Sequence, residues 1–233
     1  MSFHEILNII GFSRHPINYR EKLLSTLGGF FGIYAILFIS VRFLDPETAV
    51  YVVPSMGASA VLLFAAPHAP FSQPWNVIGG HVLSAIIGVA CWQWIADSTI
   101  AAAVSVGLAI GAMYFARCIH PPGGATALAA VIGSDKLHEL GYGYVVTPIL
   151  LNAITILLVA IAFNMLFKWR RYPAHWSLGK KPQPLGSGGY APIKHEDFVY
   201  ALSHIDTYVD IDEEDLLKIY KLATSRDVSA SHH

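Results

Sequence analysis

The chain has 233 residues with a mean hydropathy of +0.49, and 54% of its residues are hydrophobic while only 13% are charged. A soluble domain usually carries about 25% charged residues, so this composition excludes an ordinary soluble domain. The formal net charge of −1 gives none of the overall basicity of nucleic-acid-binding chains, and we expect no nucleic-acid partner. Only seven charged residues lie between residues 43 and 167, which indicates a membrane-embedded block with polar ends.

Stretches without charge predict the elements in chain order. A bilayer core about 30 Å thick needs about 20 helical residues to cross it. Four stretches reach about that length, and two others are shorter and begin near proline and glycine. The chain is therefore predicted to be an all-α polytopic membrane protein, with four long helices over about 23–44, 75–96, 98–117 and 142–168 and two short ones over about 51–67 and 118–133.

The two short stretches resemble each other. Seven residues that begin at Pro54 (PSMGASA) align with seven that begin at Pro121 (PPGGATA), at a fixed offset of 67 residues. This likeness predicts two long–short–long repeats, over about 23–96 and 98–168, and three crossings in each would make a 3+3 inverted repeat. Chance similarity between two apolar segments rich in small residues is the alternative.

Each short stretch is predicted to cross the bilayer as an extended stub followed by a half-helix. A proline disfavours helix in the residue before it, so residues 51–53 are expected to be extended and the first half-helix to begin at Ser55. The alternative is a pair of re-entrant loops, with four crossings in place of six.

The polar ends are predicted to lie in the cytoplasm. Basic residues cluster before the first long helix and after the last, and cytoplasmic loops carry such an excess. We expect a cytoplasmic N-terminal segment over 1–22, a linker over 169–192 and a cytoplasmic helical tail over 193–233. The N-terminus has no signal-peptide pattern, so the block is expected to stay in a bilayer, with a bacterial inner membrane as the predicted location.

The starts of the two half-helices are the predicted anion-binding site. A helix N-terminus has unpaired N–H groups and a partial positive charge, which together bind anions. Close packing of small residues between membrane helices is the alternative explanation. The predicted binding residues are Ser55, Gly57, Ala58, Ser59, His120, Gly123, Gly124, Ala125 and Thr126.

Polar residues elsewhere in the block are candidates for gating or coupling, because ionisable groups inside a membrane are costly. His120 could hydrogen-bond an anion, relay a proton or only cap a helix. For His81 and Asn152, an interhelical hydrogen bond is as good an explanation as ligand contact. The gating or coupling candidates are Asn76, His81, Arg117 and Asn152, of which Arg117 would guide the anion in from the cytoplasm.

Known catalytic and nucleotide-binding motifs are absent from the sequence. Walker A, G-x-S-x-G, H-E-x-x-H and G-x-G-x-x-G patterns do not occur, so we expect no enzyme and no direct use of ATP. His81, His120 and Cys118 offer no ligand pair at helical spacing, so no metal and no cofactor is expected. GxxxG patterns at Gly28–Gly32 and Gly107–Gly111 suit helix packing or a face for a homo-oligomer.

One stretch carries a family resemblance. Residues 117–128 (RCIHPPGGATAL) resemble the signature of the HPP family of integral membrane proteins, and the segments from Pro54 and Pro74 also follow its pattern. The likeness runs over about residues 20–168. The family is usually described as having four transmembrane helices, and a plant plastid member is associated with nitrite transport. The resemblance therefore implies nitrite or a similar small anion as the substrate.

These observations predict a secondary transporter or channel for a small monovalent anion, nitrite first, bound between the two half-helix N-termini. The alternative function is a membrane scaffold or sensor that acts through its cytoplasmic tail. The expected partners are the small inorganic anion, the lipid bilayer and further copies of the chain.

Overall fold

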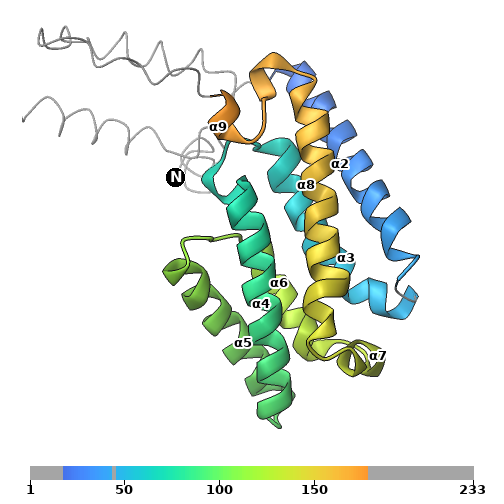
Figure 1. The fold of residues 1–233 in the computed structure, drawn as a ribbon, viewed down its shortest axis with the longest axis vertical. Helices are drawn as coiled ribbons and strands as arrows, with labels where there is room; N and C mark the ends of the chain where they lie inside the picture. The colour runs from blue at the N-terminus through green and yellow to red at the C-terminus, as the bar shows by residue number, and fades with distance from the viewer. Residues whose placement is uncertain (1–17, 44–45, 178–233) are drawn as a thin grey trace, which may run out of the picture.

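The computed structural model describes residues 18–43 and 46–177, and this part of the chain contains helices and no strand (Figure 1). The fold is therefore all-α, as predicted. The predicted tail over 193–233 lies outside the described residues. The main helices are α2 (Tyr19–Ser40), α3 (Pro46–Ala65), α4 (Pro74–Trp94), α5 (Ser98–Phe115), α6 (Pro122–Ile132) and α8 (Leu151–Met165). Shorter elements are η1 (Pro70–Ser72), α7 (Asp135–Glu139), η2 (Val145–Leu150), η3 (Lys168–Arg170) and α9 (Ala174–Ser177).

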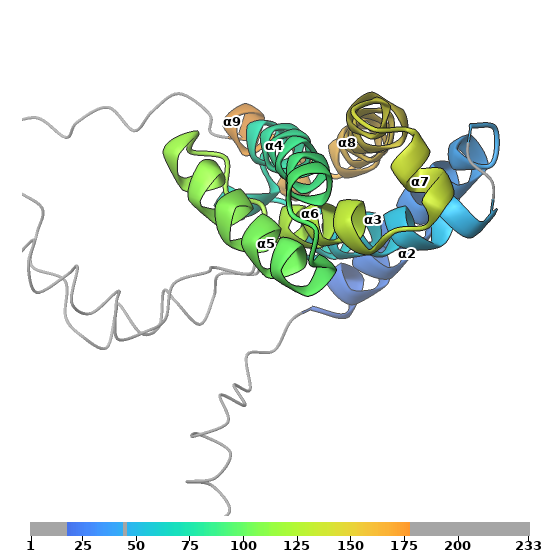
Figure 2. The ribbon, with the colours of Figure 1, turned by 90° about the horizontal axis from the view of Figure 1, so that it is seen from below.

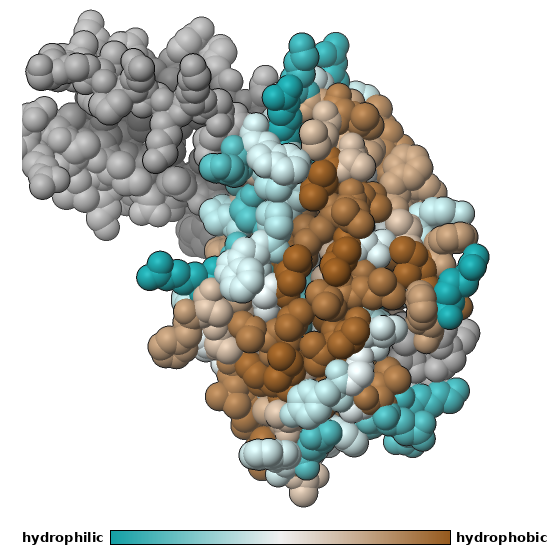
Figure 3. All heavy atoms as spheres, viewed as in Figure 1, coloured by the Kyte–Doolittle hydropathy of each residue, from teal (hydrophilic) through white to brown (hydrophobic). Residues whose placement is uncertain are grey.

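Four helices are long and apolar enough to cross a membrane, which confirms the four long helices expected from the sequence. They are α2, α4, α5 and the continuous pair of η2 and α8 over Val145–Met165. Large hydrophobic side chains on these helices stay exposed, as lipid contact requires, among them Phe30, Leu108 and Leu158. Figure 3 shows a broad hydrophobic area over the middle of one face, with hydrophilic residues toward its two ends.

The first short element differs from the prediction. Helix α3 begins at Pro46 and continues through Pro54, so residues 51–53 are helical and no helix starts at Ser55. In a bilayer an extended stub would leave its backbone N–H and C=O groups without partners, whereas a helix through a proline gives up only one hydrogen bond. The Ser55 hydroxyl also donates to the carbonyl oxygen of Val52 at 2.9 Å. The expectation of a first half-helix headed at Ser55 is therefore wrong.

The second short element follows the prediction more closely. Helix α6 has 11 residues, begins at Pro122 and is too short to cross a bilayer by itself. Seen from below, it lies among α3, α4 and α5, and it contacts all three (Figure 2). The residues before it, from Arg117 to Pro121, are not helical and connect it to α5.

The two halves of the chain use matching pairs of neighbouring helices. Helix α2 packs against α3 and α8, and α5 packs against α6 and α4. The main core lies between α3, α4 and α8 and contains Met56, Phe64, Val77 and Ile156. The inverted relation between the halves stays a prediction.

The first GxxxG pattern serves packing within the chain. A methyl group added at Gly32 would lie 2.6 Å from Cε2 of Phe64, so this face of α2 is closed by the Phe64 ring of α3. A methyl group at Gly107 or Gly111 would meet nothing within 4 Å. Of the two faces predicted for contact with another copy, only that of α5 stays open.

Candidate functional site

Four buried polar side chains meet between α3, α4 and α6. Both ring nitrogens of His81 contact a hydroxyl group. Nε2 lies 2.8 Å from the Ser59 hydroxyl, and Nδ1 lies 2.7 Å from the Thr126 hydroxyl. The same Ser59 hydroxyl contacts Nε2 of His120 at 2.9 Å, and Nδ1 of His120 contacts the carbonyl oxygen of Phe71 at 2.8 Å. All four side chains have an exposed fraction of 0%. We call this series, from Thr126 to Phe71, the histidine chain.

Ser59 and Thr126 occupy matching positions in the two similar seven-residue segments of the sequence, PSMGASA and PPGGATA. Both hydroxyls contact His81, one on each ring nitrogen. The two histidine rings lie edge to face, with centroids 4.9 Å apart. The histidine chain therefore joins residues from both halves of the membrane block.

Glycines allow the close approach that brings the histidines together. A methyl group at Gly80 would lie 2.5 Å from Cβ of His120, and one at Gly79 would lie 2.9 Å from Cβ of Cys118. One at Gly123 would lie 2.8 Å from the Gly80 carbonyl oxygen. At these positions the glycines serve helix packing, which the sequence offered as the alternative to ligand contact.

The turn that carries His120 is held by side chains of α4. Asn76 donates from Nδ2 to the carbonyl oxygen of Ile119 at 2.9 Å, and Trp75 donates from its indole N–H to that of Ala116 at 3.1 Å. Arg117 adopts a left-handed backbone conformation with φ of 53°, and it is exposed. Asn76 therefore positions the turn, and no hydrogen bond joins the exposed Arg117 to the histidine chain.

The backbone donors at the start of α6 already have acceptors. The Gly123 N–H donates to the carbonyl oxygen of His120 at 2.8 Å, and the Gly124 N–H donates to that of Pro121 at 3.1 Å. Together with the continuous α3, this differs from the expectation that two helix N-termini with free N–H groups face each other. The polar groups at this position are side chains of the histidine chain.

Apart from Gly123, which packs against Gly80 and Ser84, the predicted binding residues divide into two groups. Ser59, His120 and Thr126 lie in the histidine chain, and Ser55 is joined to it because its carbonyl oxygen accepts from the Ser59 hydroxyl at 3.1 Å. Four others lie on open faces of their helices. Ala58 and Ala125 are exposed. A methyl group at Gly57 would meet nothing within 4 Å, and one at Gly124 would meet only Val106 at 3.8 Å.

Two buried donors have no partner among the described residues. These are the hydroxyl of Ser84 and the side-chain Nδ2 of Asn152, with exposed fractions of 0% and 1%. Ser84 lies one helical turn after His81, and its hydroxyl would be 2.8 Å from a methyl group at Gly123. Asn152 accepts a hydrogen bond from Ser40 at 3.1 Å. Sequence reasoning missed Ser84, although its spacing from His81 put both on one face of a helix.

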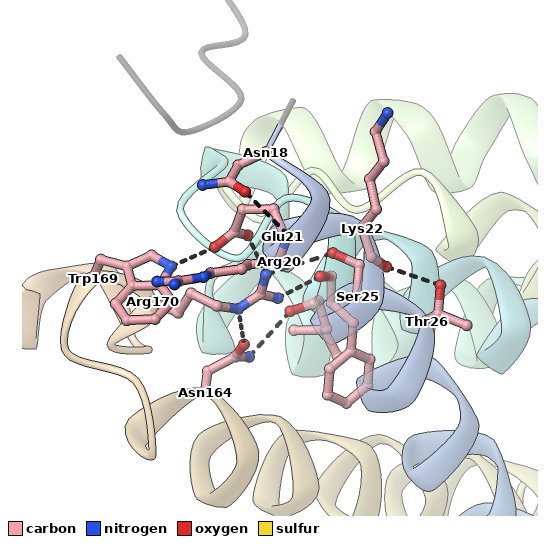
Figure 4. A network of polar contacts seen from close by, with 11 residues as sticks. Asn18, Arg20, Glu21, Lys22, Ser25, Thr26, Asn164, Trp169 and Arg170 are labelled. Carbon is pink, nitrogen blue, oxygen red and sulfur yellow. Dashed lines mark hydrogen bonds and ion pairs between the residues drawn. The ribbon is translucent and has the colours of Figure 1, made fainter. Parts of the chain in front are cut away.

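A second polar network lies where the described chain leaves the bundle (Figure 4). The Arg170 side chain is 1% exposed, forms an ion pair with Glu21 of α2, and donates to the carbonyl oxygen of Phe64. Its Nε donates to Oδ1 of Asn164 at 3.1 Å, and Asn164 donates to the carbonyl oxygen of Leu63 at 3.2 Å. Burial lowers the pKa of the Arg170 guanidinium, and the neighbouring Glu21 carboxylate opposes this shift.

This network was not predicted. Arg170 belongs to the basic cluster that follows the last long helix in the sequence, but its side chain is buried and forms an ion pair with Glu21. The signal was a lone acid near the start of the first apolar stretch and a base just after the last one. Among the described residues no group of three or more His, Cys, Asp or Glu side chains could hold a metal ion.

Comparison with known proteins assigns most of the sequence to one family. The model of the HPP transmembrane region matches residues 14–173. Two curated transmembrane proteins of Dictyostelium discoideum are similar, one 37% identical over 156 residues and one 39% identical over 169 residues. The matches cover 65% and 70% of this chain and 50% and 59% of the relatives, so the chain spans little more than half of their length. No solved structure matches. The chain is therefore an integral membrane protein that belongs to the HPP transmembrane family.

Proposed function

We propose that this protein moves a small monovalent anion across the membrane, nitrite first, as a secondary transporter or channel. The resemblance noted in the sequence supports the choice of nitrite. The observation that carries the proposal is an uncharged polar site inside an apolar bundle, with the hydroxyl of Ser84 left without a partner beside it. A buried hydroxyl without a hydrogen bond costs free energy, and a ligand that accepts from it recovers that cost.

A weakly charged donor set suits an ion that must leave again. Fixed positive charges would hold an anion tightly, whereas hydroxyl and imidazole donors replace part of its hydration shell and release it. Among the described residues, no Lys or Arg side chain forms a hydrogen bond with the histidine chain. The site is therefore suited to transient binding of a small anion.

The contact between the two halves supports alternating access. Ser59 of the first half and Thr126 of the second both contact His81, and neither contact involves a charged group. A small rotation of one half against the other would break one of these hydrogen bonds and expose a donor toward one side. Inverted-repeat transporters move in this way around a central site.

Nitrite uptake into proteoliposomes tests the proposal. We expect uptake well above that of protein-free vesicles, and a loss of about 10- to 100-fold in Ser84→Ala, because a hydrogen bond to a charged group contributes about 1.5–3 kcal/mol. Ser105→Ala is the matched control, since Ser105 is also fully buried but its hydroxyl only contacts the carbonyl oxygen of Ala102 in its own helix. Wild-type protein that takes up no nitrite would contradict the proposal.

A further inference from the structure

The directions of the hydrogen bonds in the histidine chain are determined from one end. The Phe71 carbonyl oxygen can only accept, so Nδ1 of His120 carries a hydrogen and, in the neutral ring, Nε2 accepts. Nε2 of His120 then needs a donor, which Ser59 supplies when its single hydrogen points to His120 and not to the Ser55 carbonyl oxygen 3.1 Å away. Ser59 in turn accepts from Nε2 of His81. Nδ1 of His81 accepts from Thr126. In the neutral state all four hydrogen bonds therefore point toward Phe71.

One added proton gives a second complete arrangement. When His120 carries hydrogen on both nitrogens, its Nε2 donates to Ser59, and Ser59 turns its hydrogen to Nε2 of His81. His81 then carries its hydrogen on Nδ1 and donates to Thr126. Thr126 can direct its own hydrogen to the carbonyl oxygen of Pro122, 3.4 Å away. In this second state each of the four contacts of the histidine chain pairs one donor with one acceptor, and the Ser55 carbonyl oxygen, as in the neutral state, receives no hydrogen from Ser59.

We propose that the histidine chain binds and relays one proton as a unit. A hydronium ion gives a proton to the Thr126 hydroxyl, whose own hydrogen passes to Nδ1 of His81. The hydrogen on Nε2 of His81 passes to Ser59, and that of Ser59 passes to Nε2 of His120, where the positive charge ends. In total, four O–H or N–H bonds form and four break. One of the broken bonds belongs to the hydronium ion, which becomes a water molecule.

The surroundings of His120 leave this charge uncompensated. The side chains that face it are Ser59 of α3 and His81 of α4, and Met113 of α5 lies close to Gly80 in the same contact region. Two further titratable groups lie near the histidine chain: the Cys118 thiol against Gly79, and the Tyr144 hydroxyl, which donates to the carbonyl oxygen of Thr126 at 3.1 Å. No carboxylate of the described residues hydrogen-bonds to the histidine chain.

An anion in the same site would compensate the charge. This step rests on the proposed function: when nitrite is bound, the protonated chain and the anion together are neutral, and an ion in a low-dielectric interior needs such a partner. One proton then travels with each anion. Uptake would be electroneutral, so it would respond to a pH gradient and not to the membrane potential.

Histidine ¹⁵N NMR of the protein in lipid nanodiscs tests the relay without transport. Between about pH 8 and about pH 3 we expect His120 to become doubly protonated, because burial shifts an imidazole pKa below its ordinary value of about 6.5. His81 should change from the Nε2–H to the Nδ1–H tautomer with the same midpoint. His81→Asn and His120→Asn assign the signals. A His81 tautomer that stays constant while His120 gains a proton, or a His120 that never gains one, would overturn the proposal.

Variants of Ser59 separate the relay from a structural role. In Ser59→Ala the two titrations should become independent, and Ser59→Thr, which restores the hydroxyl, should restore the common midpoint. Ser105→Ala should leave it unchanged. In His120→Asn the amide nitrogen can keep the hydrogen bond to Phe71 but carries no extra proton, so His81 should keep one tautomer throughout.

A flux measurement distinguishes the relay from the transport function. In proteoliposomes with an internal pH dye, an inward nitrite gradient should acidify the interior by one proton per anion, beyond the acidification of protein-free vesicles. Nitrite uptake that follows a clamped potential without proton movement would overturn the coupling and leave the proposed function intact. If both histidines change together but no nitrite uptake is measured, the result would support the proton relay and contradict the proposed anion transport.

Discussion

Gly123 lies where the backbone of α6 touches that of α4, and the space there is too small for a side chain. A methyl group would lie 2.8 Å from both the Gly80 carbonyl oxygen and the Ser84 hydroxyl. We expect Gly123→Ala to lower the free energy of unfolding by about 1–3 kcal/mol, the usual cost of overpacking. The measurement is the melting temperature of the detergent-solubilised protein.

Gly57 provides the matched control for this substitution. It lies in helix α3, and a methyl group there would meet nothing within 4 Å. Gly57→Ala should therefore stabilise the protein by up to about 1 kcal/mol, because alanine is the better helix former. Equal melting temperatures for the two variants would contradict the close contact between α6 and α4.

Single polar residues in apolar stretches were the most informative signal in the sequence. The sequence predicts His81 and His120 as candidates because ionisable groups inside a membrane are costly. It predicts Ser59 and Thr126 as hydroxyl donors near the half-helix starts, and the structure brings all four together. Which partner each would find could not be predicted, because that depends on how α4 crosses α3 and α6. Sequence spacing describes one helix face at a time and contains no crossing angle.

At the scale of elements, α3 shows how the bilayer overrides a local preference. Proline disfavours helix before it, and this rule predicted an extended segment before Pro54. Helix α3 instead continues through Pro54, as backbone groups in hydrocarbon must be paired. The long helices were predicted well because their length and hydrophobicity are set by bilayer thickness, which needs no knowledge of packing.

The continuity of α3 can be measured by replacing its proline. Pro54 is exposed, so Pro54→Ala removes no core contact and restores one backbone N–H to the helix. We expect a higher melting temperature, since proline in a helix interior costs up to about 3 kcal/mol relative to alanine. A lower melting temperature would indicate that residues 51–53 are extended and that proline suits that conformation.

At the scale of the whole molecule, the ion pair between Glu21 and Arg170 joins α2 to η3, the short element after α8. Removal of one partner of a buried ion pair leaves an uncompensated charge and typically costs 3–5 kcal/mol. We expect Arg170→Met to destabilise the protein by about this amount in thermal unfolding. The expected order of stability is wild type first, then the double variant Glu21→Leu/Arg170→Met, then Arg170→Met.

Arg171 is the control for this ion pair, because it is adjacent in sequence and exposed. Arg171→Met should change the stability by less than about 0.5 kcal/mol, as surface substitutions usually do. If Arg170→Met and Arg171→Met have the same melting temperature, the ion pair does not hold the ends of the bundle together.

The distribution of the histidine chain over both halves has a consequence for biogenesis. Ser59 and His81 leave the ribosome first, while His120 and Thr126 follow about forty residues later. Until then the His81 ring has only one of its two hydroxyl partners, so a nascent chain stopped before residue 120 carries an unsatisfied imidazole nitrogen. Helix α4 should therefore remain beside the translocon, in contact with water, until the second half arrives.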